Sequence, residues 1–311
     1  MVPGAAARCK ATRNWSTWRA SWCSRPRPRA RRARTEVTRV TARRVHSRRP
    51  APVPIAAVLR LLSCNILAGA RIERYRQYFT RGLTQVLPGP GKQANLDRLA
   101  DLVAQFDLVG LQEADAGSLR SGFLNQTQYL AQAAGMPYWS DQPNRHVARL
   151  ARSANGLLSR IAPHEVLDYP LPGRIPGRGA LLARYREGAR ALTMVVAHLS
   201  LGPQARARQL DFITELLADD GHAVLMGDLN CAWPGPELER LFARTRLQPP
   251  RDTLPTYPSW RPRRAIDHIL ASDGIEVLQR WTPPLAFSDH LPLAAEIRLR
   301  TSSAIAGSAR Q

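Results

Sequence analysis

The sequence has few or none of the features that mark disulfide-rich, zinc-binding or membrane-spanning proteins. It contains four cysteines in 311 residues, and none are spaced as metal ligands or as a disulfide framework. No internal repeat and no run of about 18 apolar residues occurs. We therefore expect no membrane-spanning helix, and a reduced, cytoplasmic environment is the default.

Acidic residues are nearly missing from the N-terminal part of the chain. Residues 1–50 contain 15 Arg or Lys and one acid, Glu36, whereas the remaining 261 residues contain 30 basic and 23 acidic side chains. Most of the formal net charge of +21 therefore lies in this segment. Dense like charge, many prolines and no periodic apolar face predict a disordered extension over residues 1–55. It is either an arm that binds nucleic acid or an anionic membrane, or an appendage without a role.

A twin-arginine export signal is suggested only by Arg48 and Arg49, which precede an apolar stretch at 51–62. Several prolines and Arg60 interrupt that stretch, and it runs directly into the first predicted strand. We therefore expect the protein to stay in the cytoplasm.

From residue 56 the chain alternates between apolar runs typical of strands and segments with helical spacing. Strands are predicted at 58–66, 107–113, 155–161, 179–199 (a hairpin turning at Glu187-Gly188), 222–230, 264–272 and 291–299. Helices are predicted at 93–106, 125–135, 203–219 and 236–246. This order predicts an α/β fold with one domain over residues 56–300, in which helices flank two packed mixed β-sheets. Residues 301–311 are predicted to be a loose tail.

Six short motifs lie at the ends or starts of these strands, and each contains acceptor or titratable side chains. They are SCNIL (63–67), LQEAD (111–115), AHLS (197–200), MGDLN (226–230), AIDHIL (265–270) and SDHLP (288–292). Hydrolysis of a phosphoester needs charge neutralisation on the phosphoryl oxygens, an activated water and a protonated leaving group. Carboxylates, amides and histidines at one sheet edge supply these functions. The motifs therefore predict a metal-dependent phosphoester-hydrolysing site.

Glu113 is predicted to bind the metal ion, because it ends a buried strand, and Asn65 offers a neutral oxygen to the same ion. Hard oxygen ligands of this kind suit Mg²⁺, with Mn²⁺ as a substitute. Taken alone, Glu113 would more simply be an exposed carboxylate after a strand, and it is the presence of the other motifs that favours the metal.

Proton transfer and phosphate binding are assigned to the remaining motifs. Asp228 and Asn230 are two residues apart and so share one face of an extended chain, where they can hold a water and a phosphate oxygen; a turn-forming pair is the alternative. His290 is the candidate general base or phosphate-binding histidine, and Asp267, a buried acid in an apolar strand, is its natural partner. His198 is a candidate proton donor or phosphate contact, although a lone histidine there would more often be a core residue.

Together these motifs resemble the endonuclease/exonuclease/phosphatase superfamily, with its DNase I-like fold, over residues 58–300. The resemblance is carried by the ordered set Asn65, Glu113, Asn155, His198, Asp228, Asn230, Asp267 and Asp289-His290. It implies a four-layer α/β sandwich and a magnesium-dependent phosphoesterase with the roles given above. It further implies that Asp289 completes the metal side and that Asn155 contacts the substrate.

Two loops are candidates for substrate recognition. The segment 256–267 contains Tyr257, Trp260, Arg261 and Arg263 just before Asp267, and these side chains can stack on a base and clamp a phosphate. A proline-rich loop that packs its Trp on the domain edge is an equal alternative. The segment 172–179 is either a phosphate-facing loop or a hairpin entry.

These observations predict a Mg²⁺-dependent phosphodiesterase, most simply a nuclease, that cleaves a P–O bond by in-line attack of water. One alternative is a phosphoesterase for small molecules or lipid headgroups, similar to sphingomyelinases or inositol phosphatases. Another is a catalytically idle domain that binds nucleic acid. The expected partner is a phosphoester substrate, with nucleic acid as one candidate, and no obligate protein partner is inferred.

Overall fold

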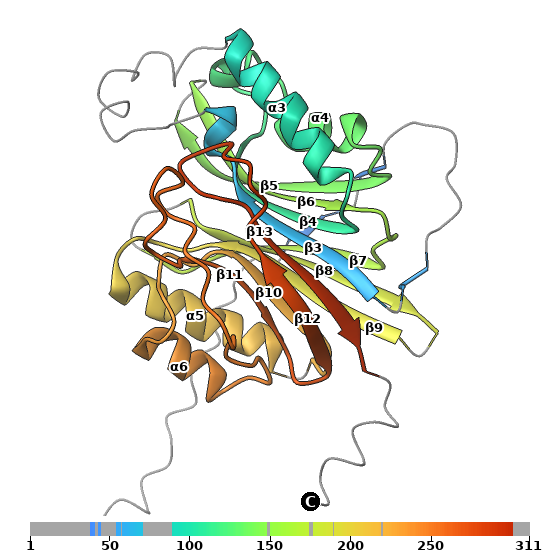
Figure 1. Cartoon of the computed structure of the whole chain (residues 1–311), viewed down its shortest axis with the longest axis vertical. Coiled ribbons are helices and arrows are strands. Elements are labelled where there is room, and N and C mark those ends of the chain that lie inside the picture. Colours follow the sequence, from blue (N-terminus) through green and yellow to red (C-terminus); the bar gives the residue numbers. More distant parts are fainter. Residues whose placement is uncertain are drawn as a thin grey trace, which may run out of the picture. The chain divides into compact units, whose positions relative to one another are not determined.

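The computed structural model describes residues 38–40, 43–44, 54–56, 58–70, 89–147, 150–173, 177–188, 190–218 and 220–300. In these ranges the chain forms two mixed β-sheets (Figure 1). The first sheet contains, in spatial order, β1 (Thr38–Val40), β7 (Glu165–Pro170), β8 (Gly179–Glu187), β9 (Arg190–His198), β10 (Ala223–Asp228) and β11 (Asp267–Ala271). The second contains β12 (Ile275–Trp281), β13 (Leu293–Leu299), β3 (Val58–Asn65), β4 (Leu108–Asp115), β6 (Ala151–Ser159), β5 (Tyr138–Val147) and β2 (Arg43–Arg44).

Helices cover the outer faces of both sheets. The α-helices of the described ranges are α3 (Pro90–Val103), α4 (Gln126–Ala133), α5 (Pro203–Leu217) and α6 (Pro236–Phe242), and 3-10 turns are η1 (Leu67–Gly69) and η2 (Leu119–Ser121). In Figure 1, α3 and α4 lie beside the second sheet and α5 and α6 beside the first. None of the described helices is long and apolar enough to cross a bilayer.

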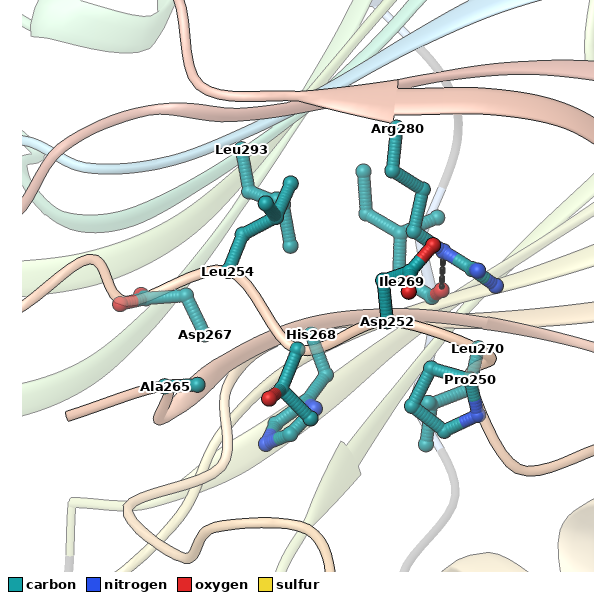
Figure 2. A pocket seen from close by; sticks show the side chains of 11 residues that line it. Pro250, Asp252, Leu254, Ala265, Asp267, His268, Ile269, Leu270, Arg280 and Leu293 are labelled. Carbon is teal, nitrogen blue, oxygen red and sulfur yellow. Dashed lines mark hydrogen bonds between the residues drawn. The ribbon is translucent and has the colours of Figure 1, made fainter.

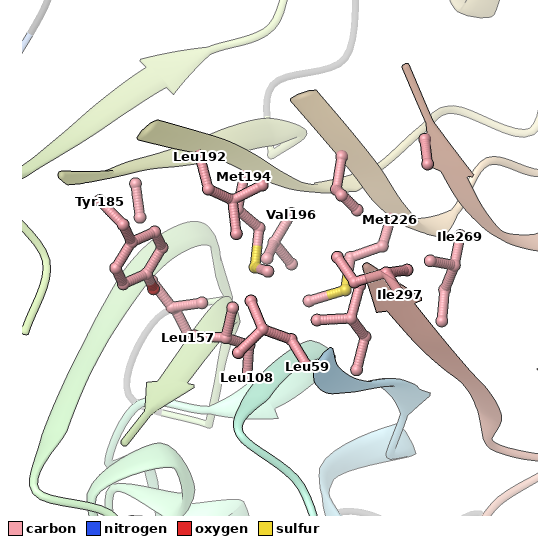
Figure 3. Close-up of a cluster of buried hydrophobic side chains, with 14 of the residues drawn as sticks. Leu59, Leu108, Leu157, Tyr185, Leu192, Met194, Val196, Met226, Ile269 and Ile297 are labelled. Atoms are coloured by element: carbon pink, nitrogen blue, oxygen red, sulfur yellow. The ribbon is translucent and has the colours of Figure 1, made fainter. Parts of the chain in front are cut away.

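Three apolar clusters account for this layering. The cluster between the sheets takes side chains from both of them (Figure 3), among them Leu59, Leu61, Leu108, Met194, Val196, Met226 and Ile269. A second cluster joins β3 and β4 to α3 and α4, and a third joins β9 and β10 to α5 and α6. Burial of these three faces gives a four-layer α/β/β/α sandwich, which confirms the predicted fold class.

Each sheet has one parallel strand pair at its centre. β3 pairs with β4 and α3 connects them, while β9 pairs with β10 through α5. The neighbours β13 and β11 run antiparallel to these pairs. Consequently the carboxyl ends of β3, β4, β9 and β10 and the starts of β11 and β13 meet at one end of the sandwich. This end carries the predicted motifs.

The alternation of side chains along the strands determines which polar groups face the gap between the sheets. On β3, Leu59 and Leu61 point into the central cluster, so Asn65, at even spacing from them, points the same way. On β9, Met194 and Val196 place His198 on the inner face in the same manner. The apolar core therefore ends in a polar group at the end of each strand.

The predicted elements agree with this structure in type, with small differences in their bounds. The helix predicted at 93–106 begins at Pro90, because proline is favoured in the first turn, where its missing N–H costs nothing. The predicted hairpin is formed by β8 and β9. The strands β1 and β2 fall inside the segment 1–55, and they pair with β7 and β5. Most of that segment, and the tail 301–311, lie outside the described residues.

Candidate active site

One carboxylate oxygen is the centre of the polar cluster. Three nitrogen atoms surround Oδ2 of Asp228: Nδ2 of Asn65 at 3.2 Å, Nε2 of His198 at 3.5 Å and Nε2 of His290 at 3.8 Å. Asp228 is 2% exposed, so this oxygen depends on protein donors in place of most of its water. Residues from β3, β9, β10 and the loop before β13 therefore converge on a single atom.

Asp267 holds His290 from the other side. Nδ1 of His290 and Oδ2 of Asp267 are 2.8 Å apart, and the hydroxyl of Thr256 donates to the same oxygen at 2.5 Å. All three residues are buried. A histidine bonded to a carboxylate through Nδ1 keeps its tautomer and orientation, so Nε2 of His290 is held towards Asp228.

Glu113 reaches the cluster through an irregularity in β4. The pairing of β4 with β6 shifts register between Leu111 and Ala114, and Glu113 has a left-handed backbone with φ +57°. Regular alternation would turn Glu113 outwards with Leu111, whereas the bulge turns it inwards. Its Oε1 lies 3.4 Å from Nδ2 of Asn65 and 3.9 Å from Nε2 of His198, and its side chain is 28% exposed.

Asn230 and Asp289 lie beside the cluster with part of their polar groups engaged. The backbone N–H of Asn230 donates to Oδ1 of Asp228, and its side-chain amide donates to the carbonyl of Leu199. Asn230 has a left-handed backbone, with φ +53°, which allows it to turn back on Asp228. Asp289 is buried next to His290, and its carbonyl accepts from Ser259.

The charges of the cluster strongly affect its titration. Burial, together with the Asp267 carboxylate, raises the pKa of Asp228 to about 7. Burial alone would lower the pKa of His290, but Asp267, helped by the charges of Asp228 and Asp289, outweighs it and raises that pKa to about 10. Burial lowers the pKa of His198 well below its usual range, and the nearby charges of Arg178 and His290 act in the same direction. At neutral pH the site thus contains a charged His290 and an uncharged His198.

The predicted substrate contacts lie at different distances from this centre. Tyr257 packs its ring 4.9 Å from that of His290, and it is half-buried. Trp260 is half-buried, and Arg261 and Arg263 are exposed in the same turn. Asn155 instead donates to Gln142 and to the carbonyl of Gly179, which ties β6 to β8. Its amide oxygen has no hydrogen-bond partner among the described atoms.

Sequence reasoning missed three residues of this region. Thr256 and Ser288 are buried hydroxyl residues; Ser288 donates to the carbonyl of Asn65 at 2.5 Å and accepts from the N–H of His290, so it joins two motifs. Arg178 precedes Gly179 on β8, next to the site end of β9, and its charge acts on His198. A lone hydroxyl carries no sequence signal. Arg178 was included only as part of the segment 172–179, the candidate phosphate-facing loop, and was not predicted as a site residue by itself.

The cluster offers ligands for a metal ion. Asp228, Asp267 and His290 each present one ligand atom, and these atoms lie within 4.8 Å of one another. Glu113 and Asn65 add oxygen-bearing side chains beside Asp228. In the present arrangement the nitrogen of the Asn65 amide faces both carboxylates, while its oxygen accepts from the N–H of Leu67. Binding through that oxygen requires the amide to be turned over.

Comparison with known proteins finds similar folds among solved structures. A solved protein from Beutenbergia cavernae DSM 12333, described as an endonuclease/exonuclease/phosphatase, is 21% identical over 79% of this chain and 73% of its own, with a TM-score of 0.61. A mannosyl-6-phosphatase from Bacteroides thetaiotaomicron is 16% identical, covers 77% and 99%, and has a TM-score of 0.56. D. rerio TDP2 in complex with a single-strand DNA product is 15% identical, covers 78% and 100%, and has a TM-score of 0.57.

These structural likenesses show the fold. No curated protein matches the chain. The profile of the endonuclease/exonuclease/phosphatase family matches residues 62–290, which include five of the six motifs and Ser288, Asp289 and His290 of the sixth. The chain therefore belongs to the endonuclease/exonuclease/phosphatase family.

Proposed function

We propose that the protein is a Mg²⁺-dependent phosphodiesterase that attacks a P–O bond with water, and that a nucleic-acid strand is its substrate. The observation that carries the proposal is the convergence of Asn65, His198 and His290 on Oδ2 of Asp228. A buried carboxylate between two histidines, one charged and one neutral, provides both a proton acceptor and a stabiliser of negative charge.

The donor set fits a divalent cation. The carboxyl groups of Asp228 and Asp267 are crowded in a buried space, and the raised pKa of Asp228 records the unfavourable charge that a cation would relieve. Asp267 is already bound by His290 and Thr256, so the side of Asp228 that faces Glu113 is the better location. We assign Glu113, Asn65 and Asp289 as the residues that would hold the ion. Bound Mg²⁺ would neutralise charge on the phosphoryl oxygens.

The chain's own residues manage the protons. Oδ2 of Asp228 is placed to orient the attacking water and to accept its proton, because it is buried and central. Nε2–H of His290, kept protonated by Asp267, is placed to donate to a phosphoryl oxygen as charge develops there. The amide nitrogen of Asn230 bonds one hydrogen to Leu199 and has a second for a phosphate oxygen. Neutral His198 lies with its Nε2 3.5 Å from Oδ2 of Asp228, and we assign it the role of keeping that carboxylate oriented.

The surroundings of the site favour a diester within a longer strand. Tyr257 stands against His290, and the guanidinium of Arg264 lies 5.8 Å from the centre of the Tyr257 ring. Exposed Arg261 and Arg263 extend this basic, aromatic turn. Arg178 adds a positive charge near His198, on another strand. Stacking groups and several positive charges spaced around one phosphoester are what a single strand requires.

The direct test is hydrolysis of bis-p-nitrophenyl phosphate with Mg²⁺ and with EDTA, followed by cleavage of a labelled single-stranded oligonucleotide. We expect turnover that requires Mg²⁺ and that falls by at least about a hundredfold in His290→Gln, because positioned acid–base groups contribute about 10²–10⁴. His164→Gln, which changes an exposed histidine on another loop, is the matched control and should keep full activity. Turnover that survives EDTA, or His290→Gln with normal activity, would reject the proposal.

The same assay separates the alternatives. A small-molecule phosphoesterase of the inositol-phosphatase kind would release phosphate from p-nitrophenyl phosphate faster than it cleaves the diester, whereas one of the sphingomyelinase kind would cleave the diester and leave the oligonucleotide intact. An idle nucleic-acid-binding domain would bind the oligonucleotide without hydrolysing either compound. Diester cleavage with no cleavage of the oligonucleotide would reject nucleic acid as the substrate and keep the phosphodiesterase.

A further inference from the structure

A second concave site lies at the opposite end of the sandwich from the candidate active site. This far pocket, a cavity of about 380 Å³, is lined by the 248–251 segment, the end of β11, the turn after it, the start of β12, and Arg280 and Arg300. β11 begins at Asp267, in the active site, and ends at Ala271, in the far pocket. At about 3.3 Å per residue the two are roughly 13 Å apart along this strand.

The carboxylates of the far pocket are already paired. Asp273 accepts two hydrogen bonds from Arg246, at 2.9 and 3.1 Å, and Glu276 accepts one from Arg298 at 3.2 Å. Neither of these two arginines is among the residues that line the pocket. The negative charges of Asp273 and Glu276 are therefore largely balanced by arginines outside the pocket.

The arginines that line the pocket lack such partners. Neither Arg251 nor Arg300 forms an ion pair with a carboxylate of the described residues, and the guanidinium of Arg300 contacts only the carbonyl of Asp273 at 3.4 Å. Arg280, the third, is half-buried and donates to the carbonyl of Ile269 at 3.4 Å. Arginine stays protonated at any pH of interest, so three positive charges face one concave space.

Arg280 also connects the far pocket with the active site. It lines a smaller cavity whose other wall includes Asp267, His268 and Leu293. Figure 2 shows the Asp252 carboxylate turned towards Arg280 at one end of this cavity and Asp267 at the other. Asp252 attracts Arg280 without forming an ion pair, so it does not remove Arg280 from the far pocket.

We propose that the far pocket is a binding site for a small phosphorylated molecule. Arg251, Arg280 and Arg300 would hold the phosphate, since guanidinium groups match phosphate oxygens in geometry and charge. Pro249, Ile275 and Val277 also line the pocket and give the organic part an apolar surface. The volume lies in the range of small-molecule sites. The site is separate from the proposed catalytic groups and does not depend on the proposed function.

The test is isothermal titration calorimetry of the full chain in EDTA, with glucose 6-phosphate and with inorganic phosphate as two separate probes. The variant Arg251→Gln/Arg300→Gln removes both unpaired guanidinium groups. We expect its affinity for glucose 6-phosphate to fall by at least about tenfold, the effect of losing one charge-assisted hydrogen bond. Tighter binding of glucose 6-phosphate than of inorganic phosphate would show that the organic part is recognised.

A charge-matched variant makes this result specific. Arg186→Gln/Arg208→Gln also removes two exposed arginines, but from β8 and α5, and should bind as the wild type does. Phosphate that binds at the active site gives the same signal in all three proteins. Equal affinity in the three proteins, or equal losses in the two variants, would overturn the proposal. Hydrolysis of bis-p-nitrophenyl phosphate should be unchanged in Arg251→Gln/Arg300→Gln. A failure of the far-pocket proposal can therefore be told apart from a failure of the proposed function.

Discussion

At the scale of one residue, Asp228 lowers the stability of the fold in order to place a reactive carboxylate in the site. Its carboxylate is buried beside Asp267, and the resulting rise of its pKa to about 7 means that ionisation is costly in the folded protein. The same ionised oxygen is the one that Asn65 and both histidines face. A residue that served stability alone would not carry a charge at this position.

The first prediction is that Asp228→Asn makes the metal-free protein more stable and inactive. Asparagine keeps the shape and removes the buried charge, and each unit of pKa shift corresponds to about 1.4 kcal/mol. We expect the free energy of unfolding in EDTA at pH 8 to rise by about 1–3 kcal/mol, measured with urea, while diester hydrolysis is lost. Asp101→Asn, an exposed change on α3, should alter neither. A less stable Asp228→Asn would show that the carboxylate is not strained.

The second prediction concerns the pH dependence that the Asp267–His290 pair imposes. The pKa of His290 is raised from 6.5 to about 10 in the folded protein, so the folded chain holds a proton that the unfolded chain releases above pH 6.5. This stabilisation is complete below pH 6.5 and is lost as the pH rises towards 10, with a slope of up to about 1.4 kcal/mol per pH unit.

Asp267→Asn should remove most of that slope. Urea unfolding in EDTA between pH 8.5 and 9.5, where Asp228 with its pKa of about 7 is almost fully ionised, should show the wild type losing stability with pH more steeply than the variant. Other groups that titrate in this window are common to both proteins and cancel in the difference. Parallel curves would mean that His290 does not retain its proton.

At the scale of elements, the parallel pair β9–β10 positions two site residues through an unusually close contact. Gly227 lies opposite Ala197, directly before Asp228 and His198, and has φ +142°. A Cβ at Gly227 would come within 1.9 Å of the Ala197 carbonyl oxygen. Both the backbone angle and the close approach therefore require glycine at this position.

The third prediction follows from that contact. Gly227→Ala should separate the ends of β9 and β10, lower the free energy of unfolding by about 3 kcal/mol or more, and reduce diester hydrolysis together with it. Gly91→Ala is the control, because Gly91 lies in the first turn of α3 with open space around it, and should not lower the stability. Native stability and activity of Gly227→Ala would show that the strands can part without cost.

The elements also show what the sequence could and could not predict. Apolar runs that end in a polar residue identified β3, β9 and β10 and the groups at their ends, because that signal is local. The bulge that turns Glu113 inwards is set by pairing with β6, which is distant in sequence, so the phase of that side chain could not be derived. Thr256 could not be predicted as a site residue for the same reason, because its hydroxyl reaches Asp267 only in the folded chain.

At the scale of the whole molecule, the apolar core and the polar end are two parts of one arrangement. The central cluster keeps the two sheets in register, and at Gly110 a Cβ would meet Met226 and Val196 of the other sheet at 2.7–3.0 Å. Site residues drawn from both sheets are therefore fixed relative to one another by close packing. Asn65 and Asp228, which are 163 residues apart, can form a hydrogen bond only because of that packing.

The last prediction concerns whether the positive charge of the N-terminal segment contributes to DNA binding. Residues 1–37 contain ten Arg or Lys and one acid. Each phosphate that such residues neutralise steepens the salt dependence of DNA binding by about one unit of log K against log salt.

A chain of residues 38–311 lacks this charge and keeps β1 and β2. If the segment is an electrostatic arm, this chain should bind duplex DNA more weakly and with a shallower salt slope than the full chain. Its hydrolysis of bis-p-nitrophenyl phosphate should be unchanged, because the proposed site residues, from Asn65 to His290, all lie within the shortened chain. Equal affinities and slopes for the two chains would instead show that the segment contributes nothing to binding, and that any preference for nucleic acid arises at Tyr257 and the arginines near it.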